Sequence, residues 1–189
     1  MAALSQMLNR LGMDYVGAYF DSHGAMIVLV YSFPLLFNSV VVLIAAMSHA
    51  SVQAVLRSHN RYRKKHHAAP LRWDGQLARY AQKWSNRCRF EHSQGDYGEN
   101  IAAGYSSWSK AVEAWYDEVK LYNYKSTGFD EQTGHFTQLV WKSTDKIGCG
   151  VRYCPHLWGG VKMYTCSYSS YGNIVGENNY YFKKNVLAP

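Results

Sequence analysis

The chain has 189 residues, which suits one domain of ordinary size with an extension. Its formal net charge is +7 at pH 7, and 15% of its residues are aromatic, so large rings are available for a core and for binding surfaces. The densest basic run, residues 61–67, closes a predicted helix, where cations complement the helix dipole, and no nucleic-acid motif accompanies it. Nucleic acid is therefore excluded as the expected partner.

The first fifty residues differ in kind from the rest of the chain. Residues 25–47 carry no charge and are long enough to span a bilayer. They are followed by Ser48-His49-Ala50, a small-x-small pattern typical of signal cleavage, although the preceding residues include two acids and one base where positive charge is expected. We predict an extension with a signal peptide at 1–50 and a secreted domain at 51–189. An uncleaved signal-anchor in the secretory pathway is the alternative.

Two helices are predicted at the start of this domain. Residues 52–65 have an apolar and a polar face, and Pro70 stops the helix soon after them. Asp74 caps a second helix that runs to about Arg89, because apolar residues recur there at helical spacing.

A short strand at 99–103 and a third helix come next. Ser107 or Ser109 caps this helix, which ends near Tyr122. A loop at 123–133 leads to a buried helix at 134–141, for which Thr133 and Gly134 supply a capping site.

Strands dominate the remainder of the chain. Residues 146–153 and 161–168 read as strands joined by the turn-rich segment 154–160, which predicts an antiparallel hairpin. Residues 171–177 are expected to add an extended piece. Most predicted helices precede the predicted strands in the chain, and this order favours an α+β fold over a repeated βαβ unit.

Four cysteines are present, and all lie after the apolar segment: Cys88, Cys149, Cys154 and Cys166. An even number in an exported chain predicts two disulfides, and spacing alone leaves three pairings open. A zinc site is the rival interpretation, but Cys88 has no close partner in the sequence, and an oxidising compartment favours disulfides.

Four ionisable residues stand where their neighbours predict burial: His92, Glu99, Glu118 and His135. Taken singly, a glutamate on a helix is usually solvated and a histidine is usually a satisfied core residue. His135 differs, because it opens a helix whose positive end favours the neutral, metal-binding form. To infer that these four residues form one site, a further indication is needed that they lie close together in the fold.

A family resemblance supplies that indication. Residues 134–141 and 164–174 resemble the two signatures of the CAP superfamily, which contains cysteine-rich secretory, antigen 5 and pathogenesis-related 1 proteins. The element His59-Asn60-Arg61-Tyr62-Arg63 matches its HNxxR element, and Gly98-Glu99-Asn100 matches its GEN element. All four occur in the family's order across about residues 52–187, and the compact domain looks most like fungal and plant members.

The resemblance implies an α-β-α sandwich around a central, mostly antiparallel sheet. It also implies that His92, Glu99, Glu118 and His135 form the family's tetrad in a central cleft. The disulfides are implied to be Cys88–Cys154 and Cys149–Cys166, and His59 and Asn60 are implied to be structural.

The tetrad permits two kinds of chemistry. Two imidazoles can hold a divalent cation such as Zn²⁺ or Mg²⁺, with the carboxylates orienting the rings. A metal-dependent hydrolase using the same four residues is the alternative, with a glutamate as general base. No third ligand and no nucleophile beside a base are visible, so we expect a protein that is not an enzyme.

A loop competes with the tetrad for the functional role. Tyr122, Tyr124 and Phe129 have the aromatic-x-aromatic-x4-aromatic spacing that resembles a caveolin-binding-type motif of sterol-exporting fungal members. We expect these rings either to bind a sterol or other lipid or to anchor the loop to the core. The leading hypothesis is a secreted lipid-binding protein, a monomer or weak dimer that meets membrane surfaces. An extracellular signalling protein without either activity is a third hypothesis.

Overall fold

The computed structural model describes residues 14–20, 26–31 and 47–189, which fall into two compact units, 1–48 and 49–189. In the first unit, strands β1 (Asp14–Phe20) and β2 (Met26–Tyr31) pair antiparallel. The strand β2 takes up the start of the expected apolar segment, and residues 32–46 of that segment lie outside the described residues. None of the helices in the described part is long and apolar enough to cross a membrane.

The second unit contains the predicted helices and strands in the predicted order. Its helices are α2 (His49–Lys65), α3 (Gly75–Ser85), α4 (Trp108–Asp117), α5 (Gly134–Val140) and α6 (Tyr180–Asn185). Its strands are β3 (Arg72–Trp73), β4 (Gly98–Ala103), β5 (Lys146–Cys154) and β6 (Val161–Ser169). Helix α2 begins at His49 and therefore includes the expected cleavage position after Ala50. Cleavage of a signal peptide at this position stays a prediction.

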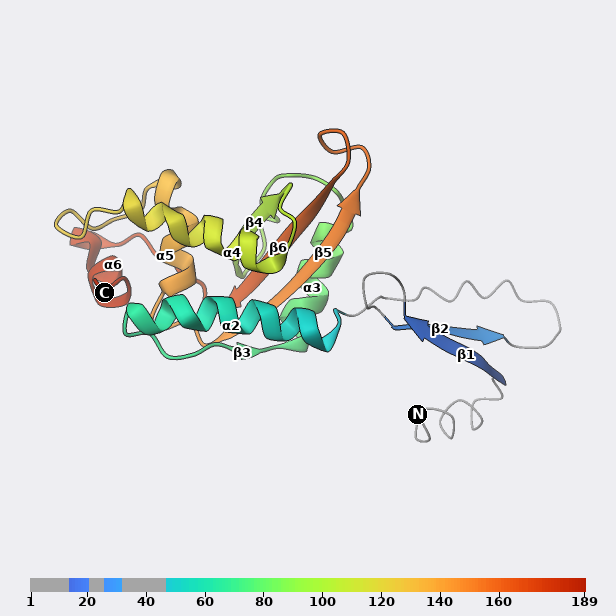
Figure 1. Cartoon of the computed structure of the whole chain (residues 1–189). Helices are drawn as coiled ribbons and strands as arrows, with labels where there is room; N and C mark the ends of the chain where they lie inside the picture. Colours follow the sequence, from blue (N-terminus) through green and yellow to red (C-terminus); the bar gives the residue numbers. More distant parts are fainter. Residues whose placement is uncertain (1–13, 21–25, 32–46) are drawn as a thin grey trace. The chain divides into compact units, whose positions relative to one another are not determined.

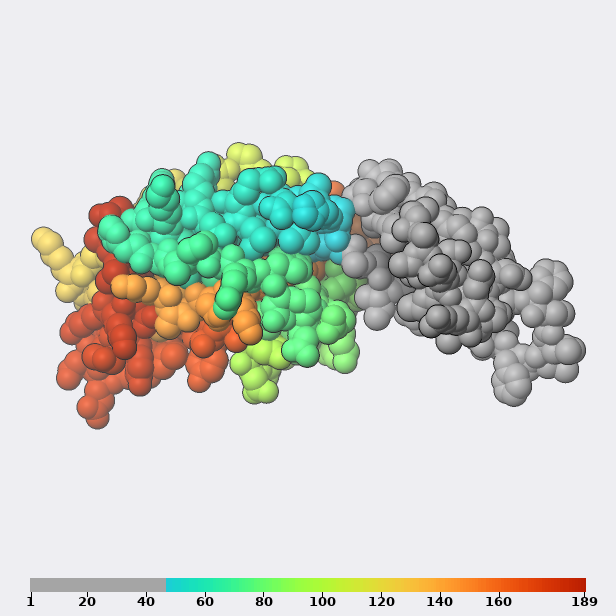
Figure 2. Space-filling view, turned by 90° about the horizontal axis from the view of Figure 1, so that it is seen from below, coloured from blue at the N-terminus to red at the C-terminus, as the bar shows by residue number. Residues whose placement is uncertain are grey.

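One four-stranded sheet lies at the centre of this unit, in the order β3-β5-β6-β4. The pairs β5–β6 and β6–β4 are antiparallel, and the two residues of β3 run parallel to β5. Helix α3 packs against β5 and β6, while α2, α4 and α5 form a second layer (Figure 1). Figure 2 shows α2 along one face, with the C-terminal segment gathered at one end. This confirms the predicted α-β-α sandwich.

Helix α3 approaches the sheet closely because β5 presents glycines to it. A Cβ atom on Gly148 would overlap the backbone of Ala78, and one on Gly150 would overlap the backbone of Gln82. The N-terminus of α3 is fixed by Asp74, whose Oδ1 accepts hydrogen bonds from the backbone N–H groups of the second and third helical residues.

Helix α2 is tied to the rest of the unit by the residues of the HNxxR element. The buried ring of His59 bonds the Val55 carbonyl and the Tyr168 hydroxyl, both at 2.9 Å. Burial lowers the pKa of His59 to about 4. Asn60 accepts a hydrogen bond from the Leu71 N–H at 2.7 Å. The implied structural roles of His59 and Asn60 are therefore seen in the fold.

The guanidinium of Arg63 is also fully buried. It donates hydrogen bonds of 2.7–3.0 Å to the carbonyls of Ala69, Leu139, Trp141 and Thr144. One side chain thereby connects α2 with the end of α5 and with the turn that leads to β5.

Both disulfides have the implied pairing. Cys88–Cys154 links the segment after α3 to the end of β5, and Cys149–Cys166 joins opposed residues of β5 and β6. The described residues contain no free cysteine.

Several predicted boundaries are wrong. Helix α3 ends at Ser85 rather than near Arg89, because the chain turns toward the disulfide and Cys88 adopts a left-handed φ of 53°. Helix α4 ends at Asp117 and continues as a 3₁₀ turn, Glu118–Lys120. Residues 171–177 form no strand, and the short helix α6 was not predicted.

Candidate functional site

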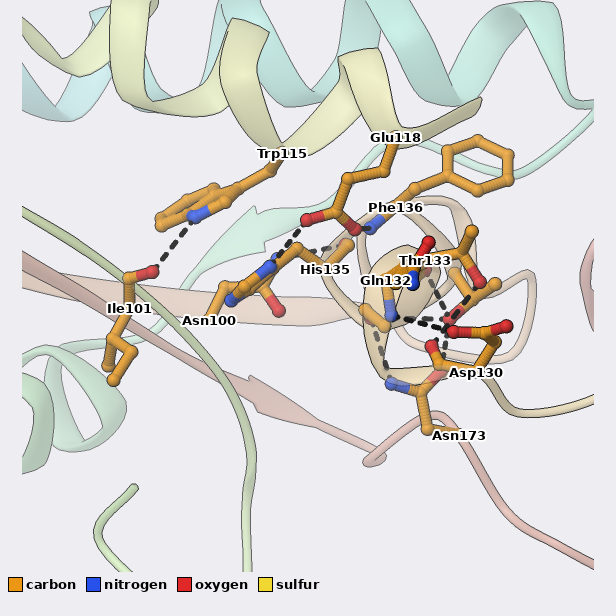
Figure 3. Close-up of polar contacts among 12 residues, drawn as sticks. Asn100, Ile101, Trp115, Glu118, Asp130, Gln132, Thr133, His135, Phe136 and Asn173 are labelled. Carbon is orange, nitrogen blue, oxygen red and sulfur yellow. Dashed lines mark hydrogen bonds and ion pairs between the residues drawn. The ribbon is translucent and has the colours of Figure 1, made fainter. Parts of the chain in front are cut away.

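The four predicted tetrad residues lie as two histidine–glutamate pairs. In the first pair, Nδ1 of His135 lies 2.6 Å from Oε1 of Glu118 (Figure 3). The other carboxylate oxygen of Glu118 accepts a hydrogen bond from the Phe136 N–H at 3.0 Å. Glu118 therefore satisfies an N–H in the first turn of α5, and the side chain of Thr133 makes no capping bond, contrary to expectation.

Neighbours on two other elements hold the His135 residue in place. The Trp115 ring of α4 stacks with the His135 ring at a centroid distance of 6.2 Å and an interplanar angle of 18°. The Trp115 Nε1–H donates to the Ile101 carbonyl of β4 at 3.1 Å. From the same strand, Asn100 donates to the His135 carbonyl at 3.0 Å. The ring position is thus set by α4, α5 and β4 together (Figure 3).

The second pair joins His92 and Glu99. Nδ1 of His92 lies 2.9 Å from Oε1 of Glu99, and the Ser93 N–H donates to the same oxygen at 2.9 Å. The hydrogen bond to Glu99 raises the pKa of His92, against an opposing effect of burial. The Glu99 side chain is 6% exposed, but that of His92 is 54% exposed, so its predicted burial is wrong. The early end of α3 leaves His92 on an exposed segment.

The donor set of the tetrad suits a cation bound by imidazole. Each ring engages a carboxylate through Nδ1, which leaves Nε2 as the nitrogen able to bind a metal. Among the described residues, no three His, Cys, Asp or Glu side chains gather as metal ligands. Each carboxylate is therefore placed to orient one imidazole, and the described residues form no three-ligand zinc site.

The loop at 122–129 contains one buried and one exposed ring. Tyr122 is 9% exposed and packs edge-on against Phe136 at a centroid distance of 5.4 Å, while Phe129 is 49% exposed. Tyr124 contacts the Tyr122 ring at 5.0 Å, and its hydroxyl lies 3.4 Å from Nδ1 of the buried His66. Burial raises the pKa of Tyr122 and that of Tyr124 to about 12. Two of the three rings thus anchor the loop.

A cavity of about 270 Å³ lies beside this loop. Its lining comes from the loop, from the segment before α5 and from one residue next to α6: Leu121, Tyr122, Asn123, Ser126, Thr127, Gly128, Phe129, Asp130, Thr133 and Asn179. Within the described residues, the buried Oγ1 of Thr127 has no hydrogen-bond partner. The cavity thus combines aromatic rings with a polar wall.

The sequence profile of the cysteine-rich secretory protein family, CAP, matches residues 56–168, which is more than half of the chain. The chain belongs to the CAP family. A second profile, transmembrane protein 18, matches residues 5–69, about a third of the chain.

Two fungal relatives and one solved structure illustrate this membership. "Repressed by EFG1 protein 1" of Candida albicans is 40% identical over 147 residues, covering 72% of this chain and 54% of the relative. "Secreted protein RBT4" of the same species is 39% identical over 150 residues, covering 72% and 40%. This CAP protein thus spans about half or less of these relatives' length. The crystal structure of NaASP2 with Zn²⁺ is 28% identical, with a TM-score of 0.59, covering 71% and 86%.

Sequence reasoning missed several residues that shape the CAP site. Trp115 and Asn100 support His135, and both lie in segments that the sequence analysis names, the third predicted helix and the GEN element. Asn179, which lines the cavity, gave no such signal. It belongs to a turn that was not predicted, in which Asn178 and Asn179 both have left-handed backbones.

Proposed function

We propose that this CAP-domain protein is secreted and binds a sterol or similar lipid through the 122–129 loop, without acting as an enzyme. A relative named as a secreted protein supports the first part. The observation that carries the second is the exposed Phe129 ring, which lines the cavity together with the anchored Tyr122 and with Asn179.

A ligand with a flat apolar body and a polar end would meet both aromatic rings and polar groups in this cavity. Phe129 and Tyr122 line the cavity with aromatic rings, and the buried hydroxyl of Thr127, which has no partner among the described residues, could accept or donate a hydrogen bond once the loop moves. The cavity is slightly below the usual range of small-molecule sites, roughly 300–1,000 Å³. Binding therefore requires Phe129 and its neighbours to move outward and close over the ligand, while Tyr122 stays in place.

Replacement of the exposed ring tests this proposal. We expect Phe129→Ala to weaken the retention of radiolabelled cholesterol by the full chain about tenfold, because one large apolar contact is lost. Tyr105→Ala is the matched control, since Tyr105 is an exposed ring outside the loop. Thermal unfolding of each variant checks the fold. Retention by Phe129→Ala equal to that of the unchanged protein would rule out the loop as the binding site.

The tetrad supports a second candidate function. Each of its two carboxylates contacts Nδ1 of one imidazole, so that Nε2 of the same ring can bind a ligand. We propose that His92 and His135 hold a divalent cation, which would act as a Lewis acid toward a bound ligand or water. A hydrolase based on this centre remains the alternative, and it predicts a hydrolytic activity that disappears when both histidines are replaced.

Metal content at two pH values tests the cation proposal. We expect the full chain, loaded with ZnCl₂ and desalted, to retain less zinc at pH 5 than at pH 7, because imidazoles must be neutral to bind a metal. The hydrogen bond to Glu99 raises the pKa of His92, so protons compete with a metal for this ring as the pH falls. Elemental analysis gives the stoichiometry, with His92→Ala as the test variant and His156→Ala as the control. Zinc retention that is unaffected by acidification or by His92→Ala would contradict the assignment.

A further inference from the structure

The tip of the β5–β6 hairpin has a cluster of exposed aromatic rings. Trp158 is 63% exposed, Tyr153 is 58% exposed, and Phe90 is 44% exposed. The ring centroids of Phe90 and Trp158 lie 4.9 Å apart at an angle of 56°. Figure 1 shows this tip projecting beyond the sheet, far from the segment that follows α4 and contains the 122–129 loop. Exposed rings that gather in this way usually mark an interaction surface.

A disulfide and packing against the core fix the conformation of this tip. The Cys88–Cys154 disulfide ties the segment bearing Phe90 to the base of the tip. Leu157 packs against the buried cluster of Ile101, Cys154 and Met163. Trp158 itself has a left-handed φ of 46°, and the two glycines after it have positive φ values as well. A non-glycine residue adopts this backbone conformation only where its surroundings impose it. The surrounding structure therefore fixes the position of the exposed Trp158 indole.

Basic residues flank these rings along the chain. Arg87, Arg89 and Arg152 are exposed, and Lys162 lies opposite Tyr153 in the β5–β6 ladder. The acidic neighbour is Glu91, whose carboxylate lies 3.6 Å from Arg89, and both side chains are more than half exposed. An exposed pair of this kind contributes little binding energy, so Arg89 remains available to an anionic partner.

We propose that this aromatic-basic tip, comprising Phe90, Tyr153 and Trp158 with Arg87, Arg89 and Arg152, docks on an anionic phospholipid bilayer. Trp and Tyr rings are favoured at the level of the lipid headgroups, where an apolar body and a polar edge are both accommodated. Arginines near a negative leaflet add electrostatic attraction. The basic residues beside the rings favour an anionic bilayer over a neutral polysaccharide.

This docking stands independently of sterol binding, because a separate surface performs it. A protein attached by the tip would keep the 122–129 loop away from the bilayer. The tip would therefore hold the protein at a membrane surface, while the loop stays accessible from the aqueous side.

Vesicle flotation with the full chain tests the proposal. We expect binding to phosphatidylcholine vesicles containing 30% phosphatidylserine, and much weaker binding to pure phosphatidylcholine or in 0.5 M NaCl, where charges are screened. Trp158→Ala should weaken binding about tenfold, through the loss of one interfacial ring. Arg89→Gln combined with Arg152→Gln should weaken it roughly tenfold to thirtyfold, since each cation near such a surface contributes about 1 kcal/mol.

Matched variants separate the tip from other membrane-binding parts of the chain. Tyr180→Ala removes a ring of similar exposure, and Lys183→Gln with Lys184→Gln removes two exposed charges next to it. These controls should bind vesicles as the unchanged protein does. The proposal is overturned if tip variants bind like the unchanged protein, since the N-terminal segment or another surface would then be responsible. It is equally overturned if the controls lose as much binding as the tip variants, or if neutral and anionic vesicles bind alike.

Discussion

Replacing Arg63 with Met is expected to lower the free energy of unfolding by about 3–5 kcal/mol. The substitution keeps much of the side-chain volume but removes the buried donor group. The carbonyls of Ala69, Leu139, Trp141 and Thr144 then lose the guanidinium that satisfies them. Because buried carbonyls without partners are costly, the effect should exceed that of an ordinary core substitution. Urea denaturation at pH 7, followed by far-UV circular dichroism, measures the difference.

The expected loss depends on how many carbonyls a replacement side chain can reach. Arg63→Lys should be less harmful than Arg63→Met, because an ammonium group keeps the charge but cannot copy the planar set of donors. Arg61→Met is the control, since Arg61 lies on the same helix and is exposed. A loss below about 1 kcal/mol for Arg63→Met would show that water replaces the guanidinium and that the side chain does not link α2 to the end of α5 and the turn before β5.

Opening the Cys88–Cys154 disulfide is expected to cost about 4 kcal/mol of stability. The two cysteines are 66 residues apart in the sequence, so the bridge removes much of the conformational entropy of the unfolded chain. The double variant Cys88→Ala, Cys154→Ala opens this bridge alone, and urea denaturation measures the change.

The second disulfide provides the comparison for this effect. Cys149 and Cys166 are 17 residues apart and already face each other across two paired strands, so the corresponding alanine pair should lose about 3 kcal/mol. A loss of less than about 1 kcal/mol from opening Cys88–Cys154 would contradict the chain-entropy argument. Loss of the first bridge should also loosen the aromatic-basic tip, whose base it fixes, and thereby reduce vesicle binding.

Much of the fold follows from local sequence signals. The sequence predicts Asp74 as one cap and offers Ser107 and Ser109 as candidates for another, because short polar side chains precede apolar residues at helical spacing. Asp74 and Ser107 accept the expected backbone hydrogen bonds. The two late strands are apolar segments on either side of a turn-rich segment, and they pair as a hairpin. The family's sequence elements then fixed the layers and the disulfide pairing, neither of which spacing alone decides.

The features that the sequence did not reveal depend on tertiary contacts. The disulfide bends the chain after Ser85 and shortens α3, which leaves His92 exposed although its neighbours suggested burial. Glu118 replaces Thr133 as the group that satisfies the start of α5, because the end of α4 brings its carboxylate there. Such a contact between distant residues leaves no periodic signal in the sequence.

The hydrogen bond from Trp115 to the carbonyl of Ile101 has a consequence for the protein's behaviour at high concentration. The strand β4 is one edge of the sheet, and an open edge is a template onto which a strand of another molecule can add. The indole occupies an acceptor on that edge, and the opposite edge, β3, has only two residues to offer. Addition of a foreign strand at β4 would have to displace this hydrogen bond, which makes such growth of the sheet less favourable.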